Sequence, residues 1–519
     1  MLQFVLGRAG SGKTEYMRKM ILERSLAEQG ECIMLVPEQY SFETEKAFLR
    51  LAGPVRANTI NVYSFTRLGE AVFHREGGAV GTRLSDAGRR ILMSCAVAAC
   101  EDELEVYRSA AKTGRVTELM LTAVNELKMC GISPETISET AQELGGQGLA
   151  KKLRELGHIY AAYEGLVAAS YLDSRDDLTR LAQLLRDVNV FSGCTIAVDS
   201  FEGFTVQELK ILGELMRQAE NVVVSLCTDG LDGDESGLFA LVDRTRRRLT
   251  QQAEDMGVKV LPPVTLNRPL RFKNENLKLL EAQLFCAQDR LTSEDCQGVF
   301  LYRAADVFQE SEFVAATIRR LVFRGYRYRD ISIICRDPQR YYGSLDVALK
   351  KREIPCFMSQ PAQVDSEPVA RFVLGAFQVV QGGFATEYLL DMLKTGVSGY
   401  SAEEISELEN YAYLWRMNGR GWRQDFVRHP RGFGWEMTQE DQEQLRRLND
   451  LRISLIEPLE RFADATADAS GAEICQAVYD LLLAFGMREN LPEFCRELET
   501  VGDDAAAERQ IRVWELLME

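Results

Sequence analysis

The clearest chemical signature in this sequence stands near its start, in the run GRAGSGKT. The run has the spacing G-x-x-x-x-G-K-T, in which glycines let successive backbone N–H groups turn toward one phosphate group. A helix that begins at the end of such a loop adds the positive end of its dipole. We therefore predict a site for ATP, formed by Gly7, Arg8, Ala9, Gly10, Ser11, Gly12, Lys13 and Thr14.

Two side chains of this loop have predicted roles. Lys13 is expected to reach the β- and γ-phosphates, and the Thr14 hydroxyl is expected to bind the Mg²⁺ that accompanies ATP. The apolar run before the loop and the helical pattern after it supply the context that this chemistry needs. The alternative is a glycine turn followed by a surface lysine.

A second candidate is Asp199, the acid that ends the apolar run TIAVD. In enzymes with this phosphate loop, an aspartate at the end of a buried strand helps to hold Mg²⁺. Hydrolysis usually needs a glutamate directly after it, which activates the attacking water. Ser200 stands there instead, and the nearby Glu202 and Glu208 lack the expected spacing. We therefore predict nucleotide binding with little or no turnover and assign no catalytic residue; alternatively, Asp199 caps a turn or a helix.

Polar and aromatic residues follow two further apolar runs, in PEQYSF (37–42) and YSFTRL (63–68). Loops at the carboxyl ends of parallel strands line the ligand crevice of an α/β fold. An amide, hydroxyls, aromatic rings and an arginine there suit single-stranded nucleic acid, by stacking and by phosphate and base-edge contacts. The alternative is ordinary helix capping by Ser41 and Ser64.

Arginines farther along the chain are weaker candidates. Arg336, at the end of the run DISIICR, is predicted to contact a γ-phosphate across a cleft, with Arg340 as the alternative. Basic residues alternate with aromatic ones in RGYRYR (324–329) and between Arg416 and Arg431. Such stretches favour a nucleic-acid backbone, although most charged stretches are solvated faces.

The hydrophobic pattern predicts the elements that position these residues. Short apolar runs alternate with helical patterns at both ends of the first 298 residues, which indicates a parallel sheet covered by helices. The predicted strands are 2–6, 31–36, 59–64, 194–201 and 221–227. Between them, 85–190 is predicted to be an all-helical insertion. A proline-containing linker is predicted around 261–271, then a second α/β unit with strands at 299–304 and 330–336, then helices from 366 onward.

Composition restricts the broad class of the protein. The chain has 519 residues and a net charge of −17, which argues against broad non-specific binding of nucleic acid but permits a local basic channel. Its twelve cysteines are scattered singly, without CxxC pairs, as expected of reduced thiols. No apolar run is long enough to cross a membrane and no signal peptide is evident, so a cytoplasmic location is expected.

The order of these pieces resembles that of a superfamily 1 helicase. More narrowly, GRAGSGKT, LVPEQYSFETE, VYSFTRL, VDSFEGFTVQE and FVAATIRRLVFRGYRYRDISIICRD resemble AddB, or RexB, which belongs to the bacterial AddAB ATP-dependent helicase/nucleases. The resemblance is collinear over essentially the whole chain. It implies an α/β fold of P-loop, RecA-like parallel sheets with all-helical insertions. The implied domains are 1A (1–84 and 191–298), 1B (85–190), the start of 2A (299–365) and an incomplete 2B (366–519).

The resemblance also implies a role. AddB-type subunits act with AddA in double-strand-break repair by recombination, bind single- and double-stranded DNA and scan for the Chi sequence, with little motor activity of their own. The nuclease domain, its metal-binding carboxylates and its iron–sulfur cluster would lie beyond Glu519. Carried over residue by residue, the resemblance makes Gln39, Ser41, Phe65, Arg67 and Phe204 the DNA-contact candidates. Two other readings stay open: an autonomous P-loop ATPase or kinase, and a scaffold with a vestigial nucleotide site.

Overall fold

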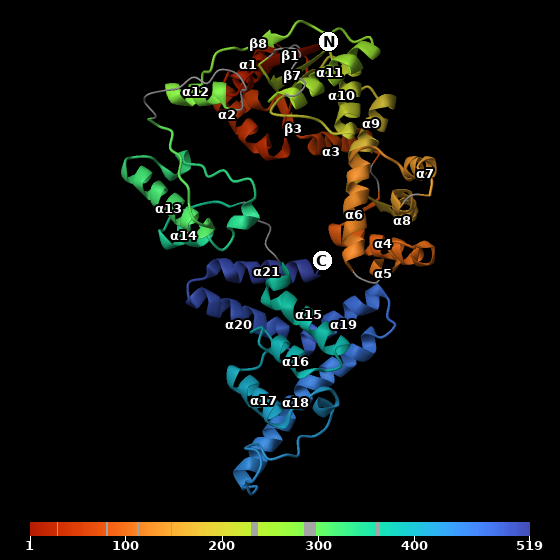
Figure 1. Cartoon of the computed structure of the whole chain (residues 1–519), viewed down its shortest axis with the longest axis vertical. Coiled ribbons are helices and arrows are strands. Elements are labelled where there is room, and N and C mark those ends of the chain that lie inside the picture. The colour runs from red at the N-terminus through yellow and green to blue at the C-terminus, as the bar shows by residue number, and fades with distance from the viewer. Residues whose placement is uncertain are drawn as a thin grey trace. The chain divides into compact units, whose positions relative to one another are not determined.

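The computed structural model describes residues 1–27, 30–78, 81–111, 114–146, 148–229, 237–284, 297–358 and 364–518. The chain forms two compact units, Met1–Arg303 and Ala304–Glu519 (Figure 1). In the described part of the first unit, six strands form one sheet in the order β3-β2-β6-β7-β1-β8, and all its strand pairs are parallel. Its strands are β1 (Leu2–Gly7), β2 (Cys32–Leu35), β3 (Ile60–Tyr63), β6 (Thr195–Val198), β7 (Asn221–Cys227) and β8 (Val264–Thr265).

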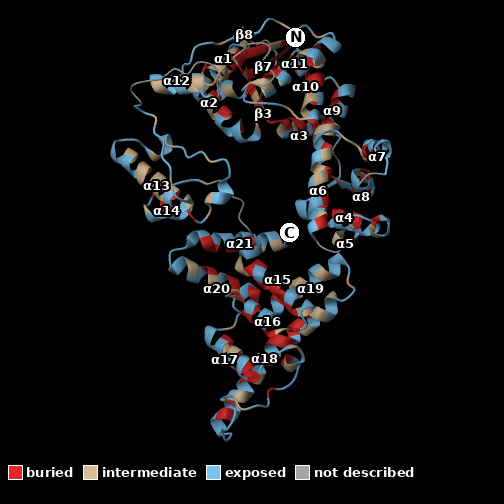
Figure 2. Cartoon of the chain, in the orientation of Figure 1, coloured by how far each residue is buried: buried red, intermediate tan, exposed pale blue. Residues whose placement is uncertain are grey.

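Helices cover both faces of this sheet, which explains why its strands are almost continuous apolar runs. Alternate residues of one strand enter different cores: Met34 of β2 packs with α1 and α2, whereas Ile33 and Leu35 pack with helices of the opposite face. Figure 2 shows the buried residues concentrated along these strands. The helices next to the sheet are α1 (Lys13–Leu26), α2 (Ser41–Ala57), α3 (Phe65–Glu76), α9 (Asp177–Asp187), α10 (Val206–Gln218) and α11 (Ala240–Asp255). The α/β class predicted from the sequence is confirmed.

The segment between β3 and β6 is mainly helical, as predicted, and has a core of its own. One detail differs, because Tyr171–Leu172 (β5) pairs with Thr82–Arg83 (β4) as a short parallel ribbon, so the segment is not entirely helical. Directly after β5, buried Asp173 is ion-paired with buried Lys128. The helices of the segment are α4 (Asp86–Ala99), α5 (Arg108–Ala111), α6 (Gly114–Met129), α7 (Pro134–Glu143) and α8 (Gly148–Ser170).

The second unit begins with α13 (Val307–Phe323) and α14 (Leu345–Lys351), which share a small apolar core. The predicted strands at 299–304 and 330–336 are wrong, since no described residue from 297 onward belongs to a strand. Apart from Asp330, the last residue of the 3₁₀ helix Tyr328–Asp330, both segments lie outside helices, and apolar side chains such as Leu301 and Ile334 are exposed. A strand exists only when its backbone pairs with a neighbour, and apolar residue types report packing rather than pairing. A second RecA-like sheet is therefore not formed by the residues described.

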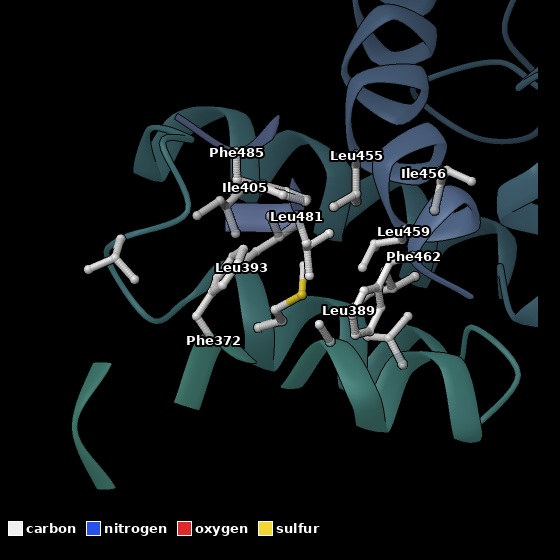
Figure 3. Packing of buried hydrophobic residues seen from close by; sticks show 14 of the residues in the cluster. Phe372, Leu389, Leu393, Ile405, Leu455, Ile456, Leu459, Phe462, Leu481 and Phe485 are labelled. Atoms are coloured by element: carbon white, nitrogen blue, oxygen red, sulfur yellow. The ribbon is translucent and has the colours of Figure 1, made fainter. Parts of the chain in front are cut away.

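The rest of the second unit is helical, as predicted, and contains an extensive apolar core (Figure 3). Phe372 and Leu389 face Leu455 and Phe462 across this core, and Leu481 and Phe485 pack in the same cluster. Its helices are α15 (Pro368–Gln381), α16 (Thr386–Leu393), α17 (Ala402–Trp415), α18 (Gln439–Thr466), α19 (Gly471–Ala484), α20 (Met487–Thr500) and α21 (Asp504–Met518). Among the helices of the described residues, none is both long and apolar enough to span a bilayer.

Candidate nucleotide site and adjacent strand edge

The phosphate-loop sequence connects the central strand β1 to helix α1. Gly10 and Gly12 have φ values of 76° and 91°, a left-handed conformation that residues with a Cβ rarely adopt. Gly12 is the N-cap of α1, and no side chain caps its first backbone N–H groups. A helix start with uncapped N–H groups is the usual place for an anion in a protein. The loop thus lies between a strand and a helix, as its sequence predicted, and phosphate binding by its N–H groups stays a prediction.

Two polar side chains of the loop, Ser11 and Lys13, are withdrawn from water. The Ser11 hydroxyl is buried and makes no hydrogen bond with any described residue. Lys13 Nζ donates to the carbonyl oxygens of Gly7, at 2.7 Å, and Arg8, at 3.0 Å. Burial lowers the pKa of the Lys13 ammonium below 10.5, although the Cys227 thiol and the Asp199 carboxylate act in the opposite direction. The loop therefore holds a desolvated cation and a hydroxyl without a partner.

Asp199 lies at the end of β6 and is buried, as predicted. Its Oδ1 accepts a hydrogen bond from the Ser225 hydroxyl of β7, and its Oδ2 accepts one from the Ser200 hydroxyl at 3.1 Å. Ser200 has a φ of 68°, so the chain turns sharply directly after the acid. The carboxylate is thus fixed at the carboxyl edge of the sheet.

The two glutamates considered as substitutes for the missing base differ in their surroundings. Glu208 accepts hydrogen bonds from the Thr205 N–H and hydroxyl, so it completes a capping box at the start of α10. Glu202 is exposed and lines a cavity beside the loop. Of the two, only Glu202 has a position that could face a ligand.

A neighbouring segment contacts the loop, and the sequence did not reveal it. The predicted linker around 261–271 instead contains the edge strand β8, whose Val264 pairs with Val5. Beyond β8, the backbone N–H groups of Leu270 and Arg271 both donate to the Gly10 carbonyl oxygen, at 2.8 and 3.1 Å. The linker prediction was wrong because a two-residue strand leaves almost no periodic pattern, and prolines around it suggest a loop.

Two cavities flank the loop and share Arg8, Ala9 and Glu281 in their linings. The smaller has a volume of about 380 Å³ and is also lined by Arg268, Thr228 and neighbouring residues. The larger has a volume of about 670 Å³ and is lined by Phe204, Phe239 and Glu202 among others. Both volumes lie in the usual range for small-ligand sites.

The DNA-contact candidates lie at the same carboxyl edge, after β2 and β3. Gln39 is exposed in a short 3₁₀ turn, Glu38–Tyr40 (η1), and the buried Ser41 hydroxyl at the start of α2 makes no hydrogen bond with any described residue. Arg67 is half-buried and its Nη1 is paired with Glu45 Oε1 at 2.8 Å. These three residues flank one edge of the sheet.

The aromatic candidates are placed differently. Phe65 is only 4% exposed, and its ring packs edge-on against Phe201 and Phe204, so its position favours a role in the core. Exposed rings at this edge come instead from Tyr40 and Phe42, of which Phe42 is 68% exposed. Sequence reasoning missed both, although each belongs to the run PEQYSF that it had singled out.

Arg336 belongs to the second unit and is exposed there, after the segment 331–335, which is neither helix nor strand. Its contact with a γ-phosphate stays a prediction.

Comparison with known proteins identifies the family of this chain. The family described as "ADDB, N-terminal" matches residues 4–281, which is more than half of the chain and includes both the loop and the strand edge. The chain belongs to the AddB family. Relatives named as the B component of an ATP-dependent helicase/deoxyribonuclease share this assignment. The protein from Acetivibrio thermocellus is 29% identical over 530 residues, covering 100% of this chain and 46% of the relative.

Two further relatives support the same family. The protein of the same name from Thermoanaerobacter pseudethanolicus is 29% identical over 100% of this chain and 46% of its own length, and that from Clostridium perfringens strain 13 is 30% identical over 89% and 41%. The chain thus spans about half the length of the curated AddB proteins it matches.

Proposed function

We propose that this chain is the nucleotide- and DNA-binding part of an AddB-type subunit and that it binds ATP with Mg²⁺ at the loop Gly7–Thr14. The observation that carries the proposal is the pairing of a buried, unpartnered Ser11 hydroxyl with a desolvated Lys13 ammonium at an uncapped helix start. Buried polar groups without partners are rare in proteins, and a bound triphosphate would give the Ser11 hydroxyl a partner and the Lys13 ammonium a counter-charge.

The residues present fit such a ligand. Backbone N–H groups at the start of α1 and the Lys13 ammonium would hold the phosphates, and Thr14 and Asp199 would hold Mg²⁺. The metal would neutralise phosphate charge. Arg271, next to Gly10 through its backbone N–H, supplies a further cation at this site.

We propose binding without rapid hydrolysis. A hydrolytic site needs a base that is positioned to activate water, and Asp199 is followed by Ser200, whose hydroxyl donates to that same carboxylate. Glu208 is held in its capping box. Substantial turnover would instead favour an autonomous ATPase, with Glu202 as the base to test first.

We further propose that single-stranded DNA binds along the carboxyl edge of β2 and β3, in a complex with an AddA-type subunit. Gln39, Ser41 and Arg67 would contact phosphates and base edges, and Tyr40 and Phe42 would stack with bases. The Arg67–Glu45 ion pair keeps an arginine at this edge in the unbound state. The relatives are named for helicase and deoxyribonuclease activity, which supports DNA as the ligand. Scanning for Chi and a role in double-strand-break repair are part of the same proposal.

The nucleotide proposal is tested by equilibrium binding of labelled ATP with Mg²⁺. We expect Lys13→Ala to weaken binding by about tenfold or more, because it removes a charge-assisted hydrogen bond to phosphate. Lys19→Ala is the matched control, since Lys19 lies on the same helix and is exposed. No binding by the unaltered chain would support the scaffold with a vestigial site.

The DNA proposal is tested by fluorescence anisotropy with labelled single-stranded DNA across a salt series, alone and with a co-purified AddA-type subunit. Arg67→Ala is expected to weaken binding and to reduce the salt dependence by about one ion. Equal affinity of Arg67→Ala and the unaltered chain under both conditions would exclude this edge as the DNA site.

A further inference from the structure

The second unit exposes a cluster of apolar and aromatic side chains that its large core does not use. The cluster lies on residues 427–437, here called the tip loop, between α17 and α18. Phe433 is 85% exposed, Trp435 58% and Val427 75%. An exposed aromatic ring forgoes the favourable free energy of burial, so a group of such rings in one loop indicates an interaction site.

The tip loop is held in place rather than left free. Trp415 Nε1 of α17 donates to the His429 carbonyl oxygen at 3.0 Å, and the Tyr411 hydroxyl bonds to both the N–H and the carbonyl oxygen of Arg428. At the other end, Arg431 makes two parallel hydrogen bonds, at 2.8 and 2.7 Å, to Asp441 of α18. The loop therefore presents its rings on a preformed backbone, which lowers the entropy lost on binding.

The rings are already arranged with guanidinium groups. Arg428 lies over the Trp415 ring, 5.0 Å from its centroid, and Arg431 lies over Trp435 at 5.1 Å. Phe433 packs edge-on against Trp415, with centroids 4.6 Å apart. Aromatic faces next to arginines are the combination that stacks bases and holds the phosphates between them.

The local charge favours an anionic ligand. Residues 413–437 contain five arginines and two acids, Asp425 and Glu436, in a chain whose net charge is −17. Two of these arginines, Arg423 and Arg431, are ion-paired with Glu460 and Asp441. Arg416, Arg420 and Arg428 are exposed. Glycines 432 and 434, on either side of Phe433, have positive φ values, and no heavy atom lies within 4 Å of a Cβ built on Gly434. The backbone of a nucleic-acid ligand could therefore approach the loop closely.

We propose that the tip loop is a second binding surface for single-stranded nucleic acid, on which Phe433 and Trp435 stack bases and Arg428 contacts phosphates. It is separate in sequence and in unit from the β2–β3 edge, so it extends the proposed function rather than restating it. Stacking makes the surface tolerant of base sequence and selective for unpaired bases.

The test measures anisotropy of a labelled thymidine oligonucleotide with the full chain. The double variant Phe433→Ala, Trp435→Ala is expected to bind about tenfold more weakly, because two stacked bases are lost. Arg428→Gln is expected to reduce the salt dependence by about one ion. Arg488→Gln, an exposed arginine of the same unit, is the matched control and should leave both quantities unchanged.

Two measurements make the result specific to the loop. Photocrosslinking with an iodouracil-containing oligonucleotide is expected to label a peptide from 428–437, and thermal unfolding of the double variant should match that of the unaltered chain, since both rings are exposed. Unchanged affinity of the folded double variant overturns the proposal, as does equal affinity for a duplex. If Arg67→Ala loses DNA binding while the loop variants keep it, the β2–β3 edge is the DNA site and the tip loop is not. If the loop variants instead abolish capture of a purified AddA-type subunit with DNA affinity unchanged, the surface binds protein.

Discussion

Arg8 and Glu281 form an ion pair with 3.0 Å between Nε and Oε1, and Arg8 Nη2 also donates to the Glu281 carbonyl oxygen at 2.6 Å. Arg8 belongs to the phosphate loop and Glu281 to α12 (Glu275–Gln283), so the pair ties the loop to a helix far away in sequence. The Arg8 guanidinium also lies over the Phe239 ring at 5.3 Å. An arginine in a phosphate loop is thus held by a carboxylate and an aromatic ring.

This relationship predicts that Glu281→Gln strengthens ATP binding by about threefold to tenfold. The variant removes a negative charge from both cavities beside the loop and releases the Arg8 side chain toward the phosphates, and one partly exposed charge is worth about 1 kcal/mol. Labelled-ATP titration measures the change. Glu275→Gln is the control, since Glu275 lies on the same helix and is exposed. Weaker binding by Glu281→Gln would mean that the ion pair is needed to shape the site.

A second prediction concerns the pH dependence of ATP binding. Burial lowers the pKa of Lys13 below 10.5, so in the unbound protein its ammonium loses a proton at a lower pH than an ordinary lysine does. A bound triphosphate favours the charged form and raises this pKa. Affinity is therefore expected to fall by roughly tenfold per pH unit between the two pKa values. Titrations across an alkaline series test this.

Lys13→Arg provides the comparison for that series. A guanidinium stays charged throughout the range, so the affinity of this variant, whatever its absolute value, should not change with alkaline pH. A fall of the same steepness in Lys13→Arg would show that another group titrates.

The strands of the first unit could be predicted because burial on both faces turns them into short apolar runs. The run NVVVSLC coincides with β7 (Asn221–Cys227), and the predicted 194–201 contains β6. The same apolar signal at 299–304 and 330–336 failed, since Phe300 and Ile334 belong to segments without a pairing neighbour in the described residues. Composition reports how apolar a segment is, but pairing depends on segments elsewhere in the chain.

The candidate site likewise has features that the sequence predicted and contacts that it did not. The loop of Gly7–Thr14 is local, so its sequence was sufficient to predict a loop between a strand and a helix. The contacts of Arg271 with Gly10 and of Glu281 with Arg8 join distant parts of the sequence, and no local pattern marks them. The exposure of the aromatic side chains could not be predicted either, because nothing in the sequence distinguishes buried Phe65 from exposed Phe42.

A third prediction concerns the stability of the helical segment. Lys128 is 2% exposed by its side chain and bonds to Asp173, Asp176 and Glu164 within 3.1 Å. Lys128→Met leaves Asp173, which is fully buried, with less compensation of its charge, and should destabilise the segment by about 3 kcal/mol. Lys151→Met, which breaks an exposed pair with Glu105, should cost less than about 1 kcal/mol. Hydrogen exchange in α4, α6 and α8 measures both.

The same network predicts an acid dependence. Burial would raise the pKa of the Asp173 carboxyl, but Lys128, the Arg175 backbone N–H and Arg89 together outweigh burial and hold it below 3.8. A carboxyl with a lowered pKa stabilises the fold above its unfolded pKa and loses that contribution as the pH falls through its folded pKa. The stability that Asp173 contributes should therefore be full at neutral pH and be lost only in strong acid. Comparison with Asp173→Asn across an acid series checks this.

The last prediction separates packing from DNA contact at the β2–β3 edge. Phe65 is buried against Phe201 and Phe204, so Phe65→Ala should destabilise the first unit by about 3 kcal/mol or more. Phe42 is exposed, with Lys46 over its ring at 5.4 Å, so Phe42→Ala should leave stability unchanged and weaken single-stranded DNA binding by about fivefold or more. Thermal unfolding and anisotropy are measured on the same preparations, with exposed Val55→Ala on α2 as the control. A Phe65→Ala protein that unfolds normally but loses DNA binding would return the stacking role to Phe65. It would also require that ring to leave the core when DNA binds.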